Sequence, residues 1–146
     1  MKSIKYILAV FTFIMFSCQL FSQQRTEMKA YYDSKNVIIN EDGRSVSNFK
    51  IVADEIQVSD LKEKAKNFQS IFILVIDEGK DEEGKYGCKI TFLQPAESTF
   101  LIKMLGGLGI YKIVAGNEEY SLNDFIINKK IVQRIFRSEE HTSELQ

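Results

Sequence analysis

The sequence predicts an α+β domain with one small sheet and two or three helices. Short apolar runs rich in β-branched residues, typical of strands, alternate along the chain with segments whose apolar residues recur at helical spacing. Residues 23–136 provide 114 positions, the usual size of one domain. Their content of Ile, Val, Leu and Phe is high enough to fold around a core rather than remain disordered.

The first elements form a predicted hairpin. Val37 to Ile39 is a short strand, and Asn40 to Gly43 contains the Asp-Gly pair that is typical of hairpin turns, because both residues tolerate positive φ. The stretch from Thr26 to Asn40 otherwise mixes polar and apolar residues. Within it, we interpret Tyr31 and Tyr32 as half-buried strand residues; the alternative is an exposed aromatic pair that binds a partner.

The first helix is predicted after a longer strand. Phe49 to Val58 is assigned to that strand, which can be interrupted at Asp54-Glu55. Ser59 is the expected N-cap, and Asp60 is favourable beside the positive end of a helix. The apolar stripe then recurs at i, i+4 and i+7, which predicts a helix of about ten residues carrying Leu61, Ala65 and Phe68.

Two further strands follow. Ile71 to Ile76 is an unbroken apolar run, so we expect a strand buried on both faces. Asp77 to Gly87 is an acidic, glycine-containing loop. In the strand from Cys88 to Leu93, alternation places Cys88, Ile90 and Phe92 on one face.

The last elements repeat the pattern. Pro95 suits the first turn of a helix that Gly106-Gly107 ends, with an apolar stripe of Phe100, Leu101, Met104 and Leu105. A strand from Ile110 to Ala115 and a turn at Gly116-Asn117 precede the returning residues Glu118 to Tyr120. Ser121 and Asp124 are spaced as a capping box for a third, short helix.

The order of these elements suggests a topology. From Phe49 to Ala115 it is strand, helix, strand, strand, helix, strand, as in the split βαβ, ferredoxin-like arrangement. That arrangement puts the second strand at the sheet edge, yet Ile71 to Ile76 is the most apolar strand. Either the N-terminal hairpin covers this edge, or the sheet is mixed and the strand is central.

Residues 1–22 have the features of a secretory signal peptide. Lys2 and Lys5 precede an almost unbroken apolar run from Ile7 to Phe16, and a more polar stretch follows to Ser22. As a helix the run spans roughly 15 Å, about half of a bilayer's hydrocarbon core, so a cleaved signal is favoured over a membrane anchor. We expect no membrane span after cleavage, and a periplasmic or secreted protein.

The end of this segment allows two interpretations. Its Phe-Ser-Gln-Gln ending, from Phe21 to Gln24, resembles signal peptides of the phylum Bacteroidota and implies cleavage before Gln23. The alternative is a lipoprotein acylated at Cys18. The preceding Met15-Phe16-Ser17 resembles a lipobox only in part, because Phe16 is bulky where a small residue is preferred.

The last ten residues resemble an artefact of sample preparation rather than part of the domain. Arg137 to Gln146, RSEEHTSELQ, resembles the in-frame translation of a common sequencing-library adapter at every position. We therefore expect the natural sequence to be truncated near Phe136 and exclude this tail from fold reasoning. The expected domain is 23–136, and His141, the one histidine of the chain, falls outside it.

Charge and cysteine content exclude several classes of function. Residues 23–136 carry 16 basic and 17 acidic side chains, a net charge of −1. Without a basic excess they are unsuited to the phosphates of nucleic acid or anionic lipid. Cys88 is their single cysteine, so no disulfide within the domain contributes to its stability.

Candidate reactive or metal-binding residues have structural explanations. Cys88 would need a base to act as a nucleophile, but its strand position indicates a buried thiol. The carboxylates between Asp77 and Gly84 could coordinate calcium by type. Gly79 and Glu82 do not fit the EF-hand pattern, however, so we expect a solvated hairpin loop. Gly106 to Gly109 follows a helix instead of preceding one, which is unlike a phosphate loop.

The adjacent carboxylates also have a structural explanation. Asp54-Glu55 and Glu118-Glu119 are neighbours in sequence, so on a strand they point to opposite faces and cannot act on one substrate. We assign no catalytic, cofactor-binding or metal-ligating residue and expect no cofactor.

These observations favour a non-enzymatic, exported binding or interaction domain of the cell envelope, acting through a sheet face or a loop on a protein or small ligand. Two alternatives are a small inhibitor or immunity-type partner, and an enzyme whose site lies partly in a missing C-terminus.

Overall fold

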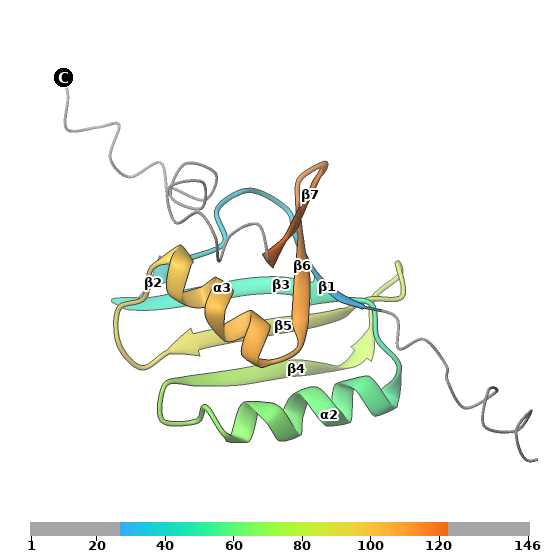
Figure 1. Cartoon of the computed structure of the whole chain (residues 1–146), viewed down its shortest axis with the longest axis horizontal. Coiled ribbons are helices and arrows are strands. Elements are labelled where there is room, and N and C mark those ends of the chain that lie inside the picture. The colour runs from blue at the N-terminus through green and yellow to red at the C-terminus, as the bar shows by residue number, and fades with distance from the viewer. Residues whose placement is uncertain (1–26, 123–146) are drawn as a thin grey trace, which may run out of the picture.

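The computed structural model describes residues 27–122, which form a small mixed sheet of seven strands with two helices (Figure 1). The α+β class is therefore confirmed. The predicted signal peptide with Cys18, the third helix, the end of the domain and the adapter-like tail lie outside the described residues. The elements are β1 (Met28–Tyr32), β2 (Ile39–Glu41), β3 (Arg44–Ile51), α2 (Glu55–Lys66), β4 (Phe72–Lys80), β5 (Tyr86–Phe92), α3 (Ser98–Gly107), β6 (Ile110–Ala115) and β7 (Glu118–Ser121).

The order of the strands differs from the ferredoxin-like expectation, which is not confirmed. The sheet runs β4-β5-β3-β1-β6-β7, with β2 paired to β3. β1 lies between β3 and β6, which would be neighbours in the expected arrangement. Ala30 is opposite Ile51 of antiparallel β3 on one side and opposite Ile113 of parallel β6 on the other. This strand was not predicted over its full length, because its five residues mix polar and apolar side chains.

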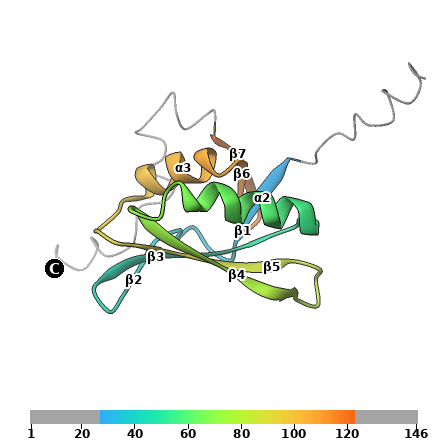
Figure 2. The same cartoon turned by 90° about the horizontal axis from the view of Figure 1, so that it is seen from below.

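Both helices cover the same face of the sheet, as the edge-on view in Figure 2 shows. The core lies between the helices and this face. It contains alternate residues of the central strands, such as Phe49 and Ile90, and the inward residues of the helices, such as Leu61 and Leu105. No helix in residues 27–122 combines the length and apolar character needed to cross a membrane.

The predicted turn between β2 and β3 is confirmed. Glu41 and Arg44 are partners in the antiparallel ladder, so the loop consists of Asp42 and Gly43 alone. Their φ angles are 50° and 75°, in the left-handed region that this tight hairpin requires. The strand itself begins later than predicted. Val37 precedes it and is buried in the core.

The start of α2 was placed incorrectly by sequence. β3 ends at Ile51 and the helix begins at Glu55, so Val58 is a buried helical residue rather than part of a strand. The N-cap is Asp54, not Ser59. The Asp54 carboxylate accepts a hydrogen bond from the Gln57 amide at 2.7 Å, and the Gln57 side chain accepts one from the Asp54 amide at 3.0 Å. This reciprocal capping box satisfies two amides that the first helical turn leaves unpaired.

The predicted burial of Ile71 to Ile76 on both faces is wrong. β4 is an outer strand of the sheet, and only one of its faces packs against the core. Phe72 and Ile76 are buried, whereas Ile73 and Val75 are 50% and 55% exposed. The apolar run predicted a strand correctly, but its composition does not reveal whether other elements cover one face of the strand or both.

The face opposite the helices carries a row of three apolar residues and one threonine across four strands. Successive cross-strand partners in this row are Ile39, Val46, Thr91 and Ile73. An ion pair between Lys89 and Glu41, 2.6 Å long, crosses the row diagonally. Glu41 is opposite Arg44 and Lys89 is opposite Asn48, two residues before and two residues after Val46. The ion pair therefore passes over Val46, which is only 1% exposed.

Of the remaining predictions, the strand phase at Cys88 is confirmed, whereas the two ends predicted for the second helix are wrong: Pro95 lies before its first turn, and Gly106-Gly107 does not end it. Cys88, Ile90 and Phe92 share the buried face of β5, as expected. α3 begins at Ser98, three residues after Pro95, and includes Gly106 and Gly107 in its last turn. The break in direction comes at Gly109, whose φ of 87° favours glycine.

The capping box gives a stability prediction. Asp54→Ala should lower the free energy of unfolding by about 1 kcal/mol, because the Gln57 amide loses its acceptor. Ser59→Ala is the matched control: Ser59 is an exposed interior position of α2, where alanine is at least as favourable as serine. Urea unfolding of both variants checks this. An equal or larger loss in Ser59→Ala would contradict the observed helix start.

Candidate functional site

Cys88 is not positioned as a nucleophile. Its side chain is 5% exposed, and its thiol makes one weak contact, 3.9 Å to the Tyr86 carbonyl oxygen. Burial raises the pKa of the Cys88 thiol to about 12, and the negative charge of Asp77 adds to this. The neutral thiol therefore dominates at physiological pH, and thiolate chemistry would be slow.

A second buried polar contact is structural. The Tyr32 hydroxyl and the Ser47 hydroxyl share a hydrogen bond of 2.9 Å between β1 and β3, beneath the helices. Burial raises the pKa of Tyr32 well above its usual value. Tyr31, its neighbour, is half-buried on the other face. The structure thus confirms two strand residues in place of an exposed aromatic pair.

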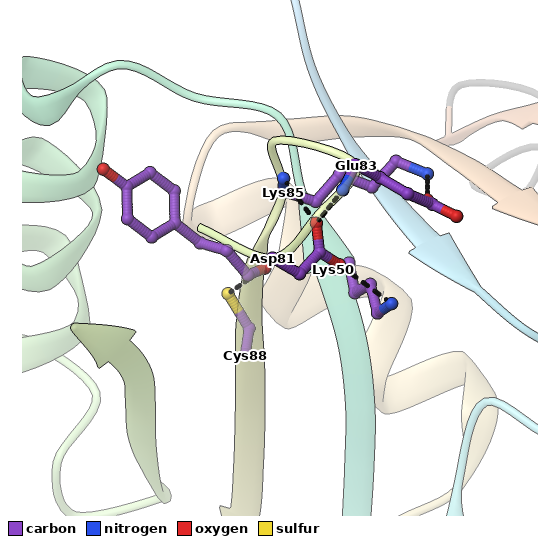
Figure 3. Close-up of polar contacts among 6 residues, drawn as sticks. Lys50, Asp81, Glu83, Lys85 and Cys88 are labelled. Carbon is purple, nitrogen blue, oxygen red and sulfur yellow. Dashed lines mark hydrogen bonds and ion pairs between the residues drawn. The ribbon is translucent and has the colours of Figure 1, made fainter. Parts of the chain in front are cut away.

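The acidic loop between β4 and β5 is held by its own hydrogen bonds (Figure 3). One carboxylate oxygen of Asp81 accepts the amides of Glu83 and Lys85, at 3.0 and 2.9 Å, and the other is 2.9 Å from the Lys50 ammonium. The backbone bond from Lys85 and the ion pair with Lys50 lower the pKa of Asp81. The Lys85 ammonium lies 4.7 Å from the ring centre of Tyr31, which attaches the loop to β1.

A hairpin loop is present, but it is shorter than the predicted Asp77 to Gly87, because β4 continues to Lys80 and β5 already begins at Tyr86. Both carboxylate oxygens of Asp81 already have partners within the chain. Within residues 27–122 no group of three or more potential metal-ligating side chains lies close enough to hold an ion.

The strand geometry expected of the adjacent carboxylates is found for Glu118-Glu119 in β7, whereas Asp54-Glu55 lies at the start of a helix. Asp54 caps α2, and Glu55 is the first helical residue. Glu118 and Glu119 form ion pairs of 2.7 Å with Lys35 and Lys29 respectively. The structure brings neither pair together over a common site.

A hollow beside the N-terminus of α3 has the dimensions of a ligand site. We call it the α3 hollow; its volume is about 540 Å³, within the usual range of small-molecule sites. Its lining residues come from the start of β4, from the loop between β5 and α3 and from the first turn of α3. The start of β4 and this loop lie at the same end of the sheet (Figure 1). A second hollow, between α2 and the start of β6, is about 220 Å³ and falls below that range.

The apolar wall of the α3 hollow is fixed by the core. Ile71, Phe92 and Phe100 line it, and the Phe92 ring is buried. The centres of the Phe92 and Phe100 rings are 5.8 Å apart, and Phe92 continues inward to Phe72 at 6.0 Å. Phe100 itself is 38% exposed, so one part of its ring is held by the core and another part faces the hollow.

The polar wall comes from the turn before β4, from the loop before α3 and from the first turn of α3. Ser70, Gln94, Glu97 and Thr99 supply hydroxyl, amide and carboxylate groups. The loop is attached to β3 because the Ala96 amide donates a hydrogen bond of 2.9 Å to the Ser45 hydroxyl. The fixed φ of Pro95 stiffens it further. An aromatic base with a few polar groups on a supported loop has the composition of a small-molecule site.

Sequence reasoning placed Phe100 in the buried stripe of α3 and did not identify this hollow. The stripe was correct for Leu101 and Leu105, which are fully buried. Phe100 lies at the edge of the stripe in the first helical turn, and Glu97 occupies the same side one turn earlier. The spacing of Glu97 and Phe100 was the one indication of a site in the sequence. That Phe100 remains partly exposed is visible only in the packing of the loop before α3 against the start of β4.

Comparison with known proteins gave no match. No family model, no curated protein and no solved structure matches this chain.

The properties of Cys88 give a second prediction. Thiol reagents should label Cys88 slowly in the native protein at pH 8, because a pKa of about 12 leaves roughly one thiol in ten thousand ionised. Labelling should become fast in denaturant. Peptide mass mapping distinguishes Cys88 from Cys18. Rapid native labelling at Cys88 would show that the thiol is accessible and the assigned strand face is wrong.

Proposed function

We propose that this chain is an exported, non-enzymatic binding domain of the cell envelope, and that the α3 hollow holds part of a protein or small ligand. The single observation that carries the binding site is the half-exposed Phe100 ring in a hollow of about 540 Å³. Export rests on the N-terminal sequence, whose charged start and short apolar run have the pattern of a cleaved signal.

The chemistry of the hollow supports binding of a group with an apolar body. Phe92 and Phe100 offer ring surface, and removing it from water on binding is favourable by roughly 25 cal/mol per Å². The polar groups at the rim would fix the orientation of the ligand without a large share of the affinity.

The described residues also favour binding over catalysis. Cys88 is buried with a raised pKa, and Asp81 has its oxygens engaged by backbone amides and Lys50. The hydroxyls and the carboxylate around the hollow are not hydrogen-bonded to a neighbouring base in any contact seen in residues 27–122. A nucleophile needs such a base to be activated.

A ring-bearing probe tests the site. 2-Phenylethanol, titrated into the ¹⁵N-labelled protein, should shift the amide resonances of Ser70, Thr99 and Phe100. Phe100→Ala should abolish these shifts, since the ring that contacts the probe is gone. Both proteins should remain folded, because Phe100 is an exposed edge residue of the core.

Tyr111→Ala is the matched control. Tyr111 is another half-exposed aromatic residue, 50% exposed, and it lies outside the α3 hollow. This variant should bind the probe as the unaltered protein does. Shifts that are absent from the hollow, or that survive in Phe100→Ala, would overturn the proposed binding site.

A further inference from the structure

We infer that the α3 hollow selects a cationic ligand group, an ammonium or guanidinium on an apolar stem. This inference rests on the proposed function and adds the chemical class of the ligand. It starts from charge: among the residues that line the hollow, Glu97 alone carries an ionisable side chain. No basic residue is part of its wall, so a bound cation would meet a single uncompensated carboxylate.

The position of Glu97 leaves its side chain available. Glu97 is the N-cap residue of α3, but it makes no side-chain hydrogen bond to the first turn. The bonds that its backbone carbonyl accepts, from the Phe100 and Leu101 amides at 3.0 and 3.1 Å, do not involve the carboxylate. Residues 27–122 provide no ion pair for it either. A capping residue with a free side chain contrasts with Asp54 of α2, whose carboxylate is bonded to the Gln57 amide.

The geometry brings the carboxylate and the ring to one ligand. Glu97 and Phe100 are three residues apart at the start of α3 and line the same hollow. A cation placed between them would be attracted both by the carboxylate and by the negative face of the Phe100 ring. The apolar stem of such a ligand would lie against Ile71 and Phe92.

The helix itself opposes this cation only weakly. The N-terminus of a helix carries about half a positive charge, whereas the carboxylate carries a full negative charge. The ligand site is therefore net negative, and it should discriminate against anions.

Three probes of one shape test the inference on the full chain. They are 2-phenylethylammonium, neutral 2-phenylethanol and anionic 3-phenylpropionate. The ammonium should bind about 3- to 10-fold more tightly than the alcohol, the gain expected of one partly exposed ion pair with a cation–π contact. The propionate should bind more weakly than the alcohol. NMR titration at low ionic strength measures all three.

Glu97→Gln should remove the preference for the ammonium and leave binding of the alcohol unchanged. Glu82→Gln makes the same change of charge in the loop between β4 and β5, outside the hollow, and should retain the preference. A fourth probe, N-acetyl-arginine amide, separates two sources of the cation. Binding tighter than the aromatic ammonium indicates a protein side chain, and weaker binding indicates a small amine.

The outcomes separate this inference from the proposed function. If the alcohol binds at Phe100 but the ammonium binds no more tightly, or if Glu97→Gln keeps the preference, the cation selectivity is wrong while the binding site stands. If no probe perturbs the hollow, the proposed function fails as well.

Discussion

β1 is paired on both of its edges, and the order of the whole sheet depends on this. On one side it continues the antiparallel group of β3, β5 and β4; on the other it forms the parallel pair with β6. Ala30 lies at the centre of both pairings and is fully buried. The hydrogen bond between Tyr32 and Ser47 ties β1 to β3 under the helices, where an unpaired hydroxyl would be unfavourable.

The position of the α3 hollow follows from this order. Because β6 is held beyond β1, α3 must cross the sheet between β5 and β6, and both helices cover one face (Figure 2). The aromatic contacts from Phe72 through Phe92 to Phe100 run from the outer part of the sheet to the start of α3. The last ring belongs to the first turn of α3 and stays partly exposed. The buried rings of the core thus support the exposed aromatic surface of the candidate site.

Local chemistry was predictable from sequence where one residue type determines the structure. The Asp42-Gly43 turn and the alternation at Cys88 depend on backbone preference and strand periodicity alone, and both are confirmed. Ser59 and Asp54 are equally good capping residues by type. The choice between them depends on Val58, which packs into the core only if the helix has already begun.

Features set by distant contacts could not be predicted in this way. The run from Ile71 to Ile76 does not encode how many layers surround it, and the exposure of Phe100 depends on how β4 and the loop before α3 meet. The short β1 strand has little signal of its own, because its pairing with β3 and β6 supplies most of its stability. The class of the fold was accessible from local pattern, whereas the strand order and the site required the tertiary structure.

The placement of β1 between β3 and β6 is tested most directly by cross-strand nuclear Overhauser effects in the labelled protein. The account predicts backbone contacts from Ala30 to both Ile51 and Ile113, the partners on its two sides. Direct contacts between Ile51 and Ile113, with none from Ala30, would show that β3 and β6 are neighbours and would contradict the account.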